Sequence, residues 1–284
     1  MQPGLIPLPQ RLAGIRHIAL DMDGTIYKGE TLFPTTLPFL ELLRKAGIGY
    51  TFLTNNPSQN ERDYQAKLLR LGIRVEPDQI YTSTQATIEY LRRNWPATRR
   101  LFVLGTPALG EAFARADFTL LPDDPAARPD AVIVGFDTTL TYGRLCRAAW
   151  WIAKGVPYFA TNPDCVCPSD EPTVLVDCGA ITAALEKATG RAPAAVLGKP
   201  DVAMPEGILR RHSLEARQLA MVGDRLYTDM VMARRSGALG VLVLTGEATA
   251  EQAAASDPPP DMVAPGLAEV GAALLEACAR ASAR

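Results

Sequence analysis

The sequence of 284 residues lacks several features that would place it in other protein classes. No apolar run approaches 18 residues, so we expect no segment that spans a bilayer. No long basic stretch is present and the net charge is only −2, which argues against partners such as nucleic acid or an anionic membrane. Residues 1–12 contain three prolines and no apolar core, so we expect no secretory signal. With 48% hydrophobic and 21% charged residues, the composition is typical of a soluble globular protein with one large or two smaller domains.

Cysteine and histidine are also scarce. The five cysteines are an odd number, which fits reduced thiols better than a disulfide framework, and we expect a cytoplasmic protein. Cys165 and Cys167 are separated by one residue instead of two to four, with no histidine nearby, so a zinc site is disfavoured. The two histidines, His17 and His212, lie far apart without an obvious catalytic partner, and we expect structural roles for both.

Short apolar stretches alternate with segments of helical periodicity along the whole chain. Such alternation predicts an α/β fold with parallel sheets covered by helices. The predicted strands end near positions 21, 54, 83, 104, 136, 161, 176, 224 and 244. The predicted helices cover residues 36–45, 60–71, 84–95, 107–116, 142–154, 178–189, 201–211, 228–236 and 266–281.

The pattern restarts at residue 99 and returns to its first form near residue 195. We therefore predict two domains, one formed by residues 1–96 and 194–284, and a smaller α/β unit formed by residues 97–193. No linker between them is long or low in complexity, so we expect the two domains to pack closely.

The first predicted strand ends in two aspartates, Asp21 and Asp23, which are followed by Gly24 and Thr25. Two neighbouring carboxylates repel each other, and folding alone gives no reason for them. A cation held between them, with one carboxylate free to attack an electrophile, does give a reason. An Asp-Gly-Thr sequence after a strand is, however, often only a turn.

Further polar residues follow other predicted strands. Taken singly they are weak signals, because a lysine before a helix is commonly a surface residue and an aspartate after a strand can simply cap a turn. These residues are Thr54, Asn55, Asn56, Lys199, Asp224 and Asp229. In parallel sheets the carboxyl ends of the strands gather at one edge, where ligands bind.

Together these residues have the chemistry of a phosphoryl-transfer site. Asp21 offers a nucleophilic carboxylate, and Asp23 can act as general acid and base. Asp21 and Asp224, with the main-chain carbonyl of Asp23, offer the hard oxygen ligands that magnesium (Mg2+) prefers. Thr54 and nearby backbone amides can hold a phosphoryl oxygen, and Lys199 can supply positive charge beside it.

This ordered set of motifs resembles the phosphatase branch of the haloacid dehalogenase-like (HAD) superfamily. The four motifs are Asp21 to Thr25, Thr54 to Asn56, Lys199-Pro200, and Gly223 to Asp229. The resemblance implies that Asp21 forms an aspartyl-phosphate, and that Asp23 protonates the leaving alcohol and then activates water. It implies that Asp224 binds Mg2+, with Asp229 as a further ligand or in support. We assign phosphate or substrate contacts to Gly24, Asn55, Asn56 and Asp164.

The spacing of the motifs narrows the resemblance. Only 33 positions separate Asp21 from Thr54, which leaves no room for a cap domain, whereas 145 positions separate Thr54 from Lys199. The arrangement is similar to that of the NagD-like phosphatases, relatives of p-nitrophenylphosphatase and pyridoxal phosphatase. It implies a Rossmann-like HAD core (residues 1–96 and 194–284) with an inserted smaller C2-type cap (97–193). Relatives commonly pair through the cap, which leaves a homodimer open.

The substrate is not readable from these motifs. Sequence departures from the relatives fall at 176–180 and 165–173, in or near the cap, which usually selects substrate. Asp164 and residues 165–172 are candidates for contacts with the leaving group, or for a structural link between cap and core. A sugar phosphate, phosphoglycolate, pyridoxal phosphate or a nucleotide would each suit a small phosphorylated partner.

Two other functions are alternatives to a phosphatase. A dehalogenase would need no acid two residues after its nucleophile, so Asp23 argues against that reaction. A non-catalytic module that binds phosphorylated metabolites would be favoured if Asp21 or Lys199 were replaced, and both are present.

Overall fold

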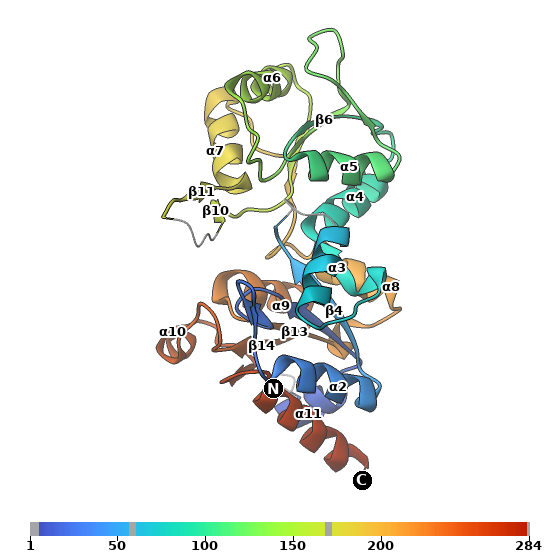
Figure 1. Ribbon diagram of the computed structural model, residues 1–284, viewed down its shortest axis with the longest axis vertical. Coiled ribbons are helices and arrows are strands. Elements are labelled where there is room, and N and C mark those ends of the chain that lie inside the picture. The colour runs from blue at the N-terminus through green and yellow to red at the C-terminus, as the bar shows by residue number, and fades with distance from the viewer. Residues whose placement is uncertain (1–5, 57–60, 168–171, 283–284) are drawn as a thin grey trace, which may run out of the picture. The chain divides into compact units, whose positions relative to one another are not determined.

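The computed structural model describes residues 6–56, 61–167 and 172–282. These residues group into two compact units, each an α/β arrangement (Figure 1). The first unit draws on Met1–Leu53, Lys67–Ile80 and Pro205–Arg284, and the second on Thr54–Ala66 and Tyr81–Met204. The predicted alternation of strands and helices is confirmed.

The larger sheet has six strands in the order β15-β14-β13-β1-β4-β5. Its central strand β1 is parallel to both neighbours, with Leu20 beside Val222 on one side and Phe52 on the other. Every residue of β1 is buried, as expected for a central strand with an apolar sequence covered on both faces. The strands are β1 (His17–Asp21), β4 (Gly49–Thr54), β5 (Ile80–Thr82), β13 (Leu219–Gly223), β14 (Leu239–Val243) and β15 (Met262–Ala264).

Helices and turns of the first unit surround this sheet. Helix α2 ends where its period predicts, because Gly47 adopts a left-handed conformation with φ of 66° that a side chain would strain. The helices are α1 (Leu8–Ala13), α2 (Thr36–Ala46), α8 (Ala203–Arg211), α9 (Val231–Ser236), α10 (Ala250–Ala255) and α11 (Leu267–Ser282), with 3₁₀ turns at Pro77–Gln79 and Ala216–Gln218. A two-stranded hairpin follows β1, formed by β2 (Tyr27–Lys28) and β3 (Thr31–Leu32).

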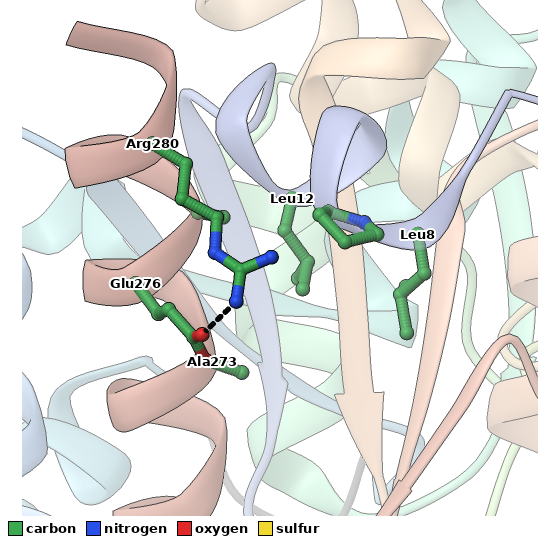
Figure 2. A pocket seen from close by; sticks show the side chains of 7 residues that line it. Leu8, Leu12, Ala273, Glu276 and Arg280 are labelled. Atoms are coloured by element: carbon green, nitrogen blue, oxygen red, sulfur yellow. Dashed lines mark hydrogen bonds and ion pairs between the residues drawn. The ribbon is translucent and has the colours of Figure 1, made fainter. Parts of the chain in front are cut away.

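The two terminal helices of the chain pack against each other. Helix α11 contacts both α1 and α2, and α2 and α11 lie side by side in Figure 1. Between α1 and α11 is a small pocket of about 210 Å³, bordered by the ion pair of Glu276 and Arg280 (Figure 2). Its lining is otherwise apolar, so α1 is held to α11 by hydrophobic contact: Leu8, Pro9, Leu12, Ala273 and Ala277.

The second unit contains a five-stranded sheet in the order β12-β9-β8-β6-β7. Its strands are β6 (Arg100–Leu104), β7 (Thr119–Leu120), β8 (Ala131–Val134), β9 (Tyr158–Ala160) and β12 (Ala195–Val196). The adjoining helices are α4 (Ser83–Asn94), α5 (Pro107–Arg115), α6 (Tyr142–Ala153) and α7 (Cys178–Thr189), and a short hairpin joins β10 (Val166–Cys167) to β11 (Leu175–Val176). Helix α3 (Glu61–Arg70) is divided between the two units.

Both faces of this smaller sheet are covered, because successive strand residues point to opposite faces. Val132 and Val134 pack with residues of α6 and α7, which lie side by side in Figure 1. Ala131 and Ile133 pack instead with residues of α4 and α5. The continuous apolar sequence of β8 therefore reflects burial on two sides.

One predicted helix differs in detail from the structure. The segment predicted as a helix over 228–236 begins as a π-helical turn at Leu226–Met230 and becomes α-helical only at Val231–Ser236. Such turns often accompany functional sites because they change the direction of a side chain within a helix. Here the turn carries Asp229, which is fully buried.

Among the described residues, no helix combines the length and the apolar character needed to cross a membrane.

The two histidines, distant in sequence, stack on each other at the start of β1. Their ring centroids are 4.2 Å apart, and Nε2 of His17 lies 2.9 Å from the Thr51 hydroxyl. Burial, and then the neighbouring His212, lowers the pKa of His17 to about 3. The structural role of His17 should therefore make the stability of the fold depend on pH.

We expect His17 to weaken the fold in acid. In the unfolded chain its pKa returns to about 6.5, so the unfolded state gains a proton below that pH while the folded state does not until about pH 3. The free energy of unfolding therefore falls as pH drops through this window, by up to about 1.4 kcal/mol per pH unit. Urea unfolding between pH 7.5 and 4.5 would show a shallower decline for His17→Gln. Identical pH dependences for both proteins would contradict this assignment.

Candidate active site

Three buried aspartates gather in the first unit. Each of Asp21, Asp224 and Asp229 offers one carboxylate oxygen, and these oxygens all lie within 4.8 Å of one another. Asp21 is the last residue of β1, and Asp224 directly follows the neighbouring strand β13. The parallel register of β1 and β13 therefore brings together acids that are about 200 positions apart.

The surroundings of Asp224 leave little room for anything but its carboxylate. A Cβ atom on Gly24 would lie 2.4 Å from its Oδ2, and one on Gly246 would lie 1.9 Å from the same atom. Neither position can therefore carry a side chain without displacing Asp224. Oδ2 of Asp224 accepts a hydrogen bond from the backbone N–H of Glu247 at 2.7 Å.

The clustered acids alter the protonation of Asp224. Burial raises the pKa of the Asp224 carboxyl, and the charges of Asp21 and Asp229 raise it further. The first motif suggested repulsion between Asp21 and Asp23, and in the structure the charge of Asp21 raises the pKa of both Asp23 and Asp224.

The three aspartates fit a hard divalent cation. Oδ1 of Asp224 is buried and has no hydrogen-bond partner among the described residues. An orphaned buried carboxylate oxygen is costly unless a cation satisfies it. Oxygens on a Mg2+ ion lie about 2.1 Å from the metal, and so about 3–4.2 Å from one another, which agrees with the spacing of this cluster.

Asp23 stands apart from the three buried acids. Its side chain is exposed, and among the described residues the carboxylate cluster does not include it. Burial of its immediate surroundings raises the pKa of the Asp23 carboxyl, an effect that Lys67 opposes and Asp21 reinforces. An accessible carboxyl with a raised pKa suits a group that exchanges protons with a substrate or with water.

The loop after β14 belongs to this site, although the sequence patterns did not single it out. Thr245 Oγ1 donates a hydrogen bond to the Gly24 carbonyl at 2.6 Å, and the next two residues contact Asp224 as described above. The only available signal was a Thr-Gly pair following a predicted strand, which is common in ordinary turns.

A second group of predicted residues lies in the second unit, centred on Asn55. Its side-chain N–H groups donate to the Lys199 carbonyl at 2.9 Å and to Asp164 Oδ2 at 3.0 Å. Its Oδ1 accepts from the Lys199 backbone N–H at 2.6 Å. Asn55 thus ties the third motif to the start of the predicted cap loop, while its contact with phosphate stays a prediction.

The neighbouring second-motif residues are held in the same unit. Thr54 Oγ1 accepts from the Asn56 N–H at 3.2 Å, and Tyr64 Oη donates to the Asn56 carbonyl at 3.1 Å. Lys199 is buried, with 4% of its surface exposed. A buried lysine needs negative charge nearby, which suits a role beside a phosphate.

The predicted site residues fall into two groups, one in each unit. The carboxylate part lies in the first unit, and the part with Thr54, Asn55 and Lys199 lies in the second. Of the predicted leaving-group loop at 165–172, residues 168–171 lie outside the described residues. Of the remainder, Cys167 Sγ accepts from the Asn56 amide at 3.7 Å, and among the described residues neither Cys165 nor Cys167 joins a cluster of metal ligands.

Replacing Asn55 tests whether its hydrogen bonds to Lys199 and Asp164 stabilise the fold. We expect Asn55→Ala to destabilise the protein by about 2–4 kcal/mol, because three side-chain hydrogen bonds are lost and buried partners are left unsatisfied. The urea unfolding midpoint would fall accordingly. Asn94→Ala is the matched control, since Asn94 is exposed and makes one bond, to the Tyr90 carbonyl. Equal unfolding midpoints for the two variants would rule out this stabilising role of Asn55.

In open parallel α/β sheets ligands bind at the carboxyl ends of the strands, and here buried carboxylates of two central strands lie at that position. Known proteins with similar sequences indicate which enzyme family has this arrangement. Residues 18–119 match the family model described as haloacid dehalogenase-like hydrolase, and residues 196–270 match a second HAD-like hydrolase model.

Individual relatives are phosphatases. The chain is 30% identical over 256 residues to ribonucleotide monophosphatase NagD of Escherichia coli (strain K12), covering 90% of this chain and 98% of that protein. Its fold matches 4-nitrophenylphosphatase from Thermotoga maritima with a TM-score of 0.87 and 39% identity, over 93% and 99% of the two chains. Glycerol phosphate phosphatase from Mycobacterium tuberculosis in complex with magnesium matches with a TM-score of 0.82 and 30% identity, over 93% and 77%.

The chain belongs to the haloacid dehalogenase-like hydrolases and, within them, to the NagD-like phosphatases, so it is a phosphoric monoester hydrolase. The predicted architecture, a Rossmann-like parallel-sheet core with a smaller α/β cap, is thereby confirmed. Phosphatases of this family use a divalent metal, and the three aspartates are residues of the right kind to hold one.

Proposed function

We propose that the protein hydrolyses a small phosphomonoester with Mg2+ as cofactor and an aspartyl-phosphate on Asp21 as intermediate. The cluster of Asp21, Asp224 and Asp229 carries this proposal. Its buried carboxylates are suited to a hard cation. Beside such a cation the Asp21 carboxylate can act as a nucleophile on phosphorus, because the cation would offset the negative charge of the phosphoryl group.

The proposal joins the two parts of the site. Thr54 immediately follows Leu53, the register partner of Asp21 in the sheet. Chain continuity thus supports placing the Thr54 hydroxyl at the phosphoryl group that Asp21 attacks. The hydrogen bonds between Asn55 and Lys199 support placing the Lys199 cation there as well. Gly24, Asn55, Asn56 and Asp164 are assigned to the phosphate or the substrate on the same basis.

The reaction takes two steps. A carboxylate oxygen of Asp21 forms a bond to phosphorus while the ester P–O bond breaks, and Asp23 gives its proton to the departing alcohol oxygen. Asp23 then takes a proton from water, and that water attacks phosphorus and breaks the bond to Asp21. Inorganic phosphate leaves, Asp21 is again a carboxylate, and Asp23 is again protonated.

Bound Mg2+ would be held by Asp21, Asp224, Asp229 and the main-chain carbonyl of Asp23, and would offset negative charge on the phosphoryl oxygens. Lys199 supports the same charge from the second unit.

The substrate is proposed only as a class. The relatives named above, at similar identities, carry names for three different esters: a ribonucleotide, 4-nitrophenyl phosphate and glycerol phosphate. A sugar phosphate, phosphoglycolate, pyridoxal phosphate or a nucleotide is our proposed range. The core at 1–96 and 194–284, the cap at 97–193, a homodimer through the cap, and a cytoplasmic location stay predictions.

A steady-state screen of phosphorylated metabolites with Mg2+ present tests this function. We expect release of inorganic phosphate from at least one class of small monoester. If no ester is turned over while one or more still bind, as detected by calorimetry, the alternative of a non-catalytic phosphometabolite-binding module would replace our proposal.

A further inference from the structure

Glu247 contacts Asp224 and the turn that follows it, and no motif predicted these contacts. Its backbone N–H donates to Asp224 Oδ2 at 2.7 Å. Its side-chain Oε2 forms an ion pair with Arg225 Nε at 3.0 Å and accepts a hydrogen bond from Tyr227 Oη at 3.1 Å. The loop after β14 is thus fastened to the turn after β13 by both backbone and side chain.

Arg225 is the cation beside the buried acids. It directly follows Asp224, and its backbone N–H donates to Asp229 Oδ2 at 3.1 Å. Its guanidinium carries a positive charge between two groups of carboxylates, the three clustered acids and Glu247, with which it forms an ion pair at 3.0 Å. The Arg225 side chain is therefore under attraction from two directions, toward the cluster and toward Glu247.

The two directions have opposite consequences for a metal ion. A guanidinium that turns onto Asp21 or Asp224 would form the short, bidentate pair that arginine and carboxylate favour. The oxygens in such a pair are no longer available as metal ligands. Three buried acids make that arrangement attractive unless another carboxylate competes for the guanidinium.

We propose that Glu247 is a positioning residue that holds Arg225 away from the oxygens of Asp21 and Asp224 and so keeps them available to a divalent cation. Tyr227 donates to the same Oε2 and fixes the orientation of the Glu247 carboxylate. Half of the Glu247 side chain is exposed (49%), whereas the three acids are buried. Glu247 is therefore more accessible to solvent than the cluster. This inference rests on the proposed metal site.

Side-chain variants isolate the effect, because the bond from position 247 to Asp224 comes from the backbone and survives substitution. We would titrate Mg2+ into substrate-free protein by isothermal calorimetry. Glu247→Ala should bind Mg2+ roughly tenfold more weakly, and Glu247→Gln should fall between it and the wild type, since it keeps an acceptor oxygen but loses the charge. Glu269→Ala, at an exposed glutamate on α11, controls for the loss of one negative charge.

The double variant separates this role from a merely structural one. If Arg225 is the competitor, Arg225→Ala should bind Mg2+ at least as tightly as the wild type, and Glu247→Ala with Arg225→Ala should return to that level. Unchanged affinity in Glu247→Ala, or a double variant as weak as Glu247→Ala, would overturn the inference. Absence of Mg2+ binding to the wild type would instead overturn the metal site of the proposed function, and this inference with it.

Discussion

Asp21→Asn is expected to abolish phosphatase turnover while the chain stays folded. An amide at this position cannot attack phosphorus, and it also removes one of the charges of the carboxylate cluster. We expect kcat/KM for the best ester to fall by a factor of about 10⁴ or more, in line with the loss of other covalent nucleophiles. Steady-state assay of purified variant and wild type measures the difference.

The fold should not be the cause of this loss. Replacing one of three mutually repelling carboxylates with a neutral amide relieves repulsion, so the urea unfolding midpoint should be equal to or above that of the wild type. Asp78→Asn, at an exposed position, is the matched control and should keep full activity. Substantial activity in Asp21→Asn would remove Asp21 from its assigned role as nucleophile.

Removal of the divalent cation is expected to have a comparable effect. A chelator should reduce turnover to background, and added Mg2+ should restore it, because the phosphoryl charge is then no longer offset. Asp224→Asn should bind Mg2+ at least about a hundredfold more weakly, since Oδ1 of Asp224 is a buried oxygen that lacks a hydrogen-bond partner among the described residues. Calorimetric titration of Mg2+ measures this change independently of activity.

Two results would contradict the metal assignment. One is turnover that persists at full rate after exhaustive chelation. The other is an Asp224→Asn variant whose Mg2+ affinity equals that of the wild type. Restoration by Ca2+ alone would leave Asp224 as a ligand but exclude Mg2+ as the cofactor.

The sequence was most informative where local pattern and burial coincide. β6 at Arg100–Leu104 and α7 at Cys178–Thr189 have the predicted bounds, because an apolar run and a capped periodic segment each end at clear turn residues. α1, α10, β7 and β15 were missed, since each is only two to six residues long and too short to show a period. The π-helical turn at Leu226–Met230 has a helical pattern and cannot be distinguished from an α-helix by periodicity.

For the site, order along the chain was enough to identify the acids but not their neighbours. Asp21 and Asp224 each follow a strand, and parallel pairing brings them together. Glu247 could not be found in this way. Strand β14 pairs with β13, but the contact of Glu247 with Asp224 depends on the path of the loop that follows β14. Asn55 was recognised by motif, but its three bonds to Lys199 and Asp164 depend on the folded second unit.

Covalent trapping of the intermediate tests the central claim most directly. In Asp23→Asn the base for the second step is missing, whereas 4-nitrophenolate leaves with little need of a proton, so the phosphoenzyme should accumulate. The reaction with 4-nitrophenyl phosphate would be quenched, treated with borohydride, which reduces an acyl phosphate to an alcohol, and mapped by peptide mass spectrometry. We expect reduction at position 21, and at no position in the variant that also carries Asp21→Asn. An unmodified Asp21, or a phosphorylated residue elsewhere, would contradict the central claim.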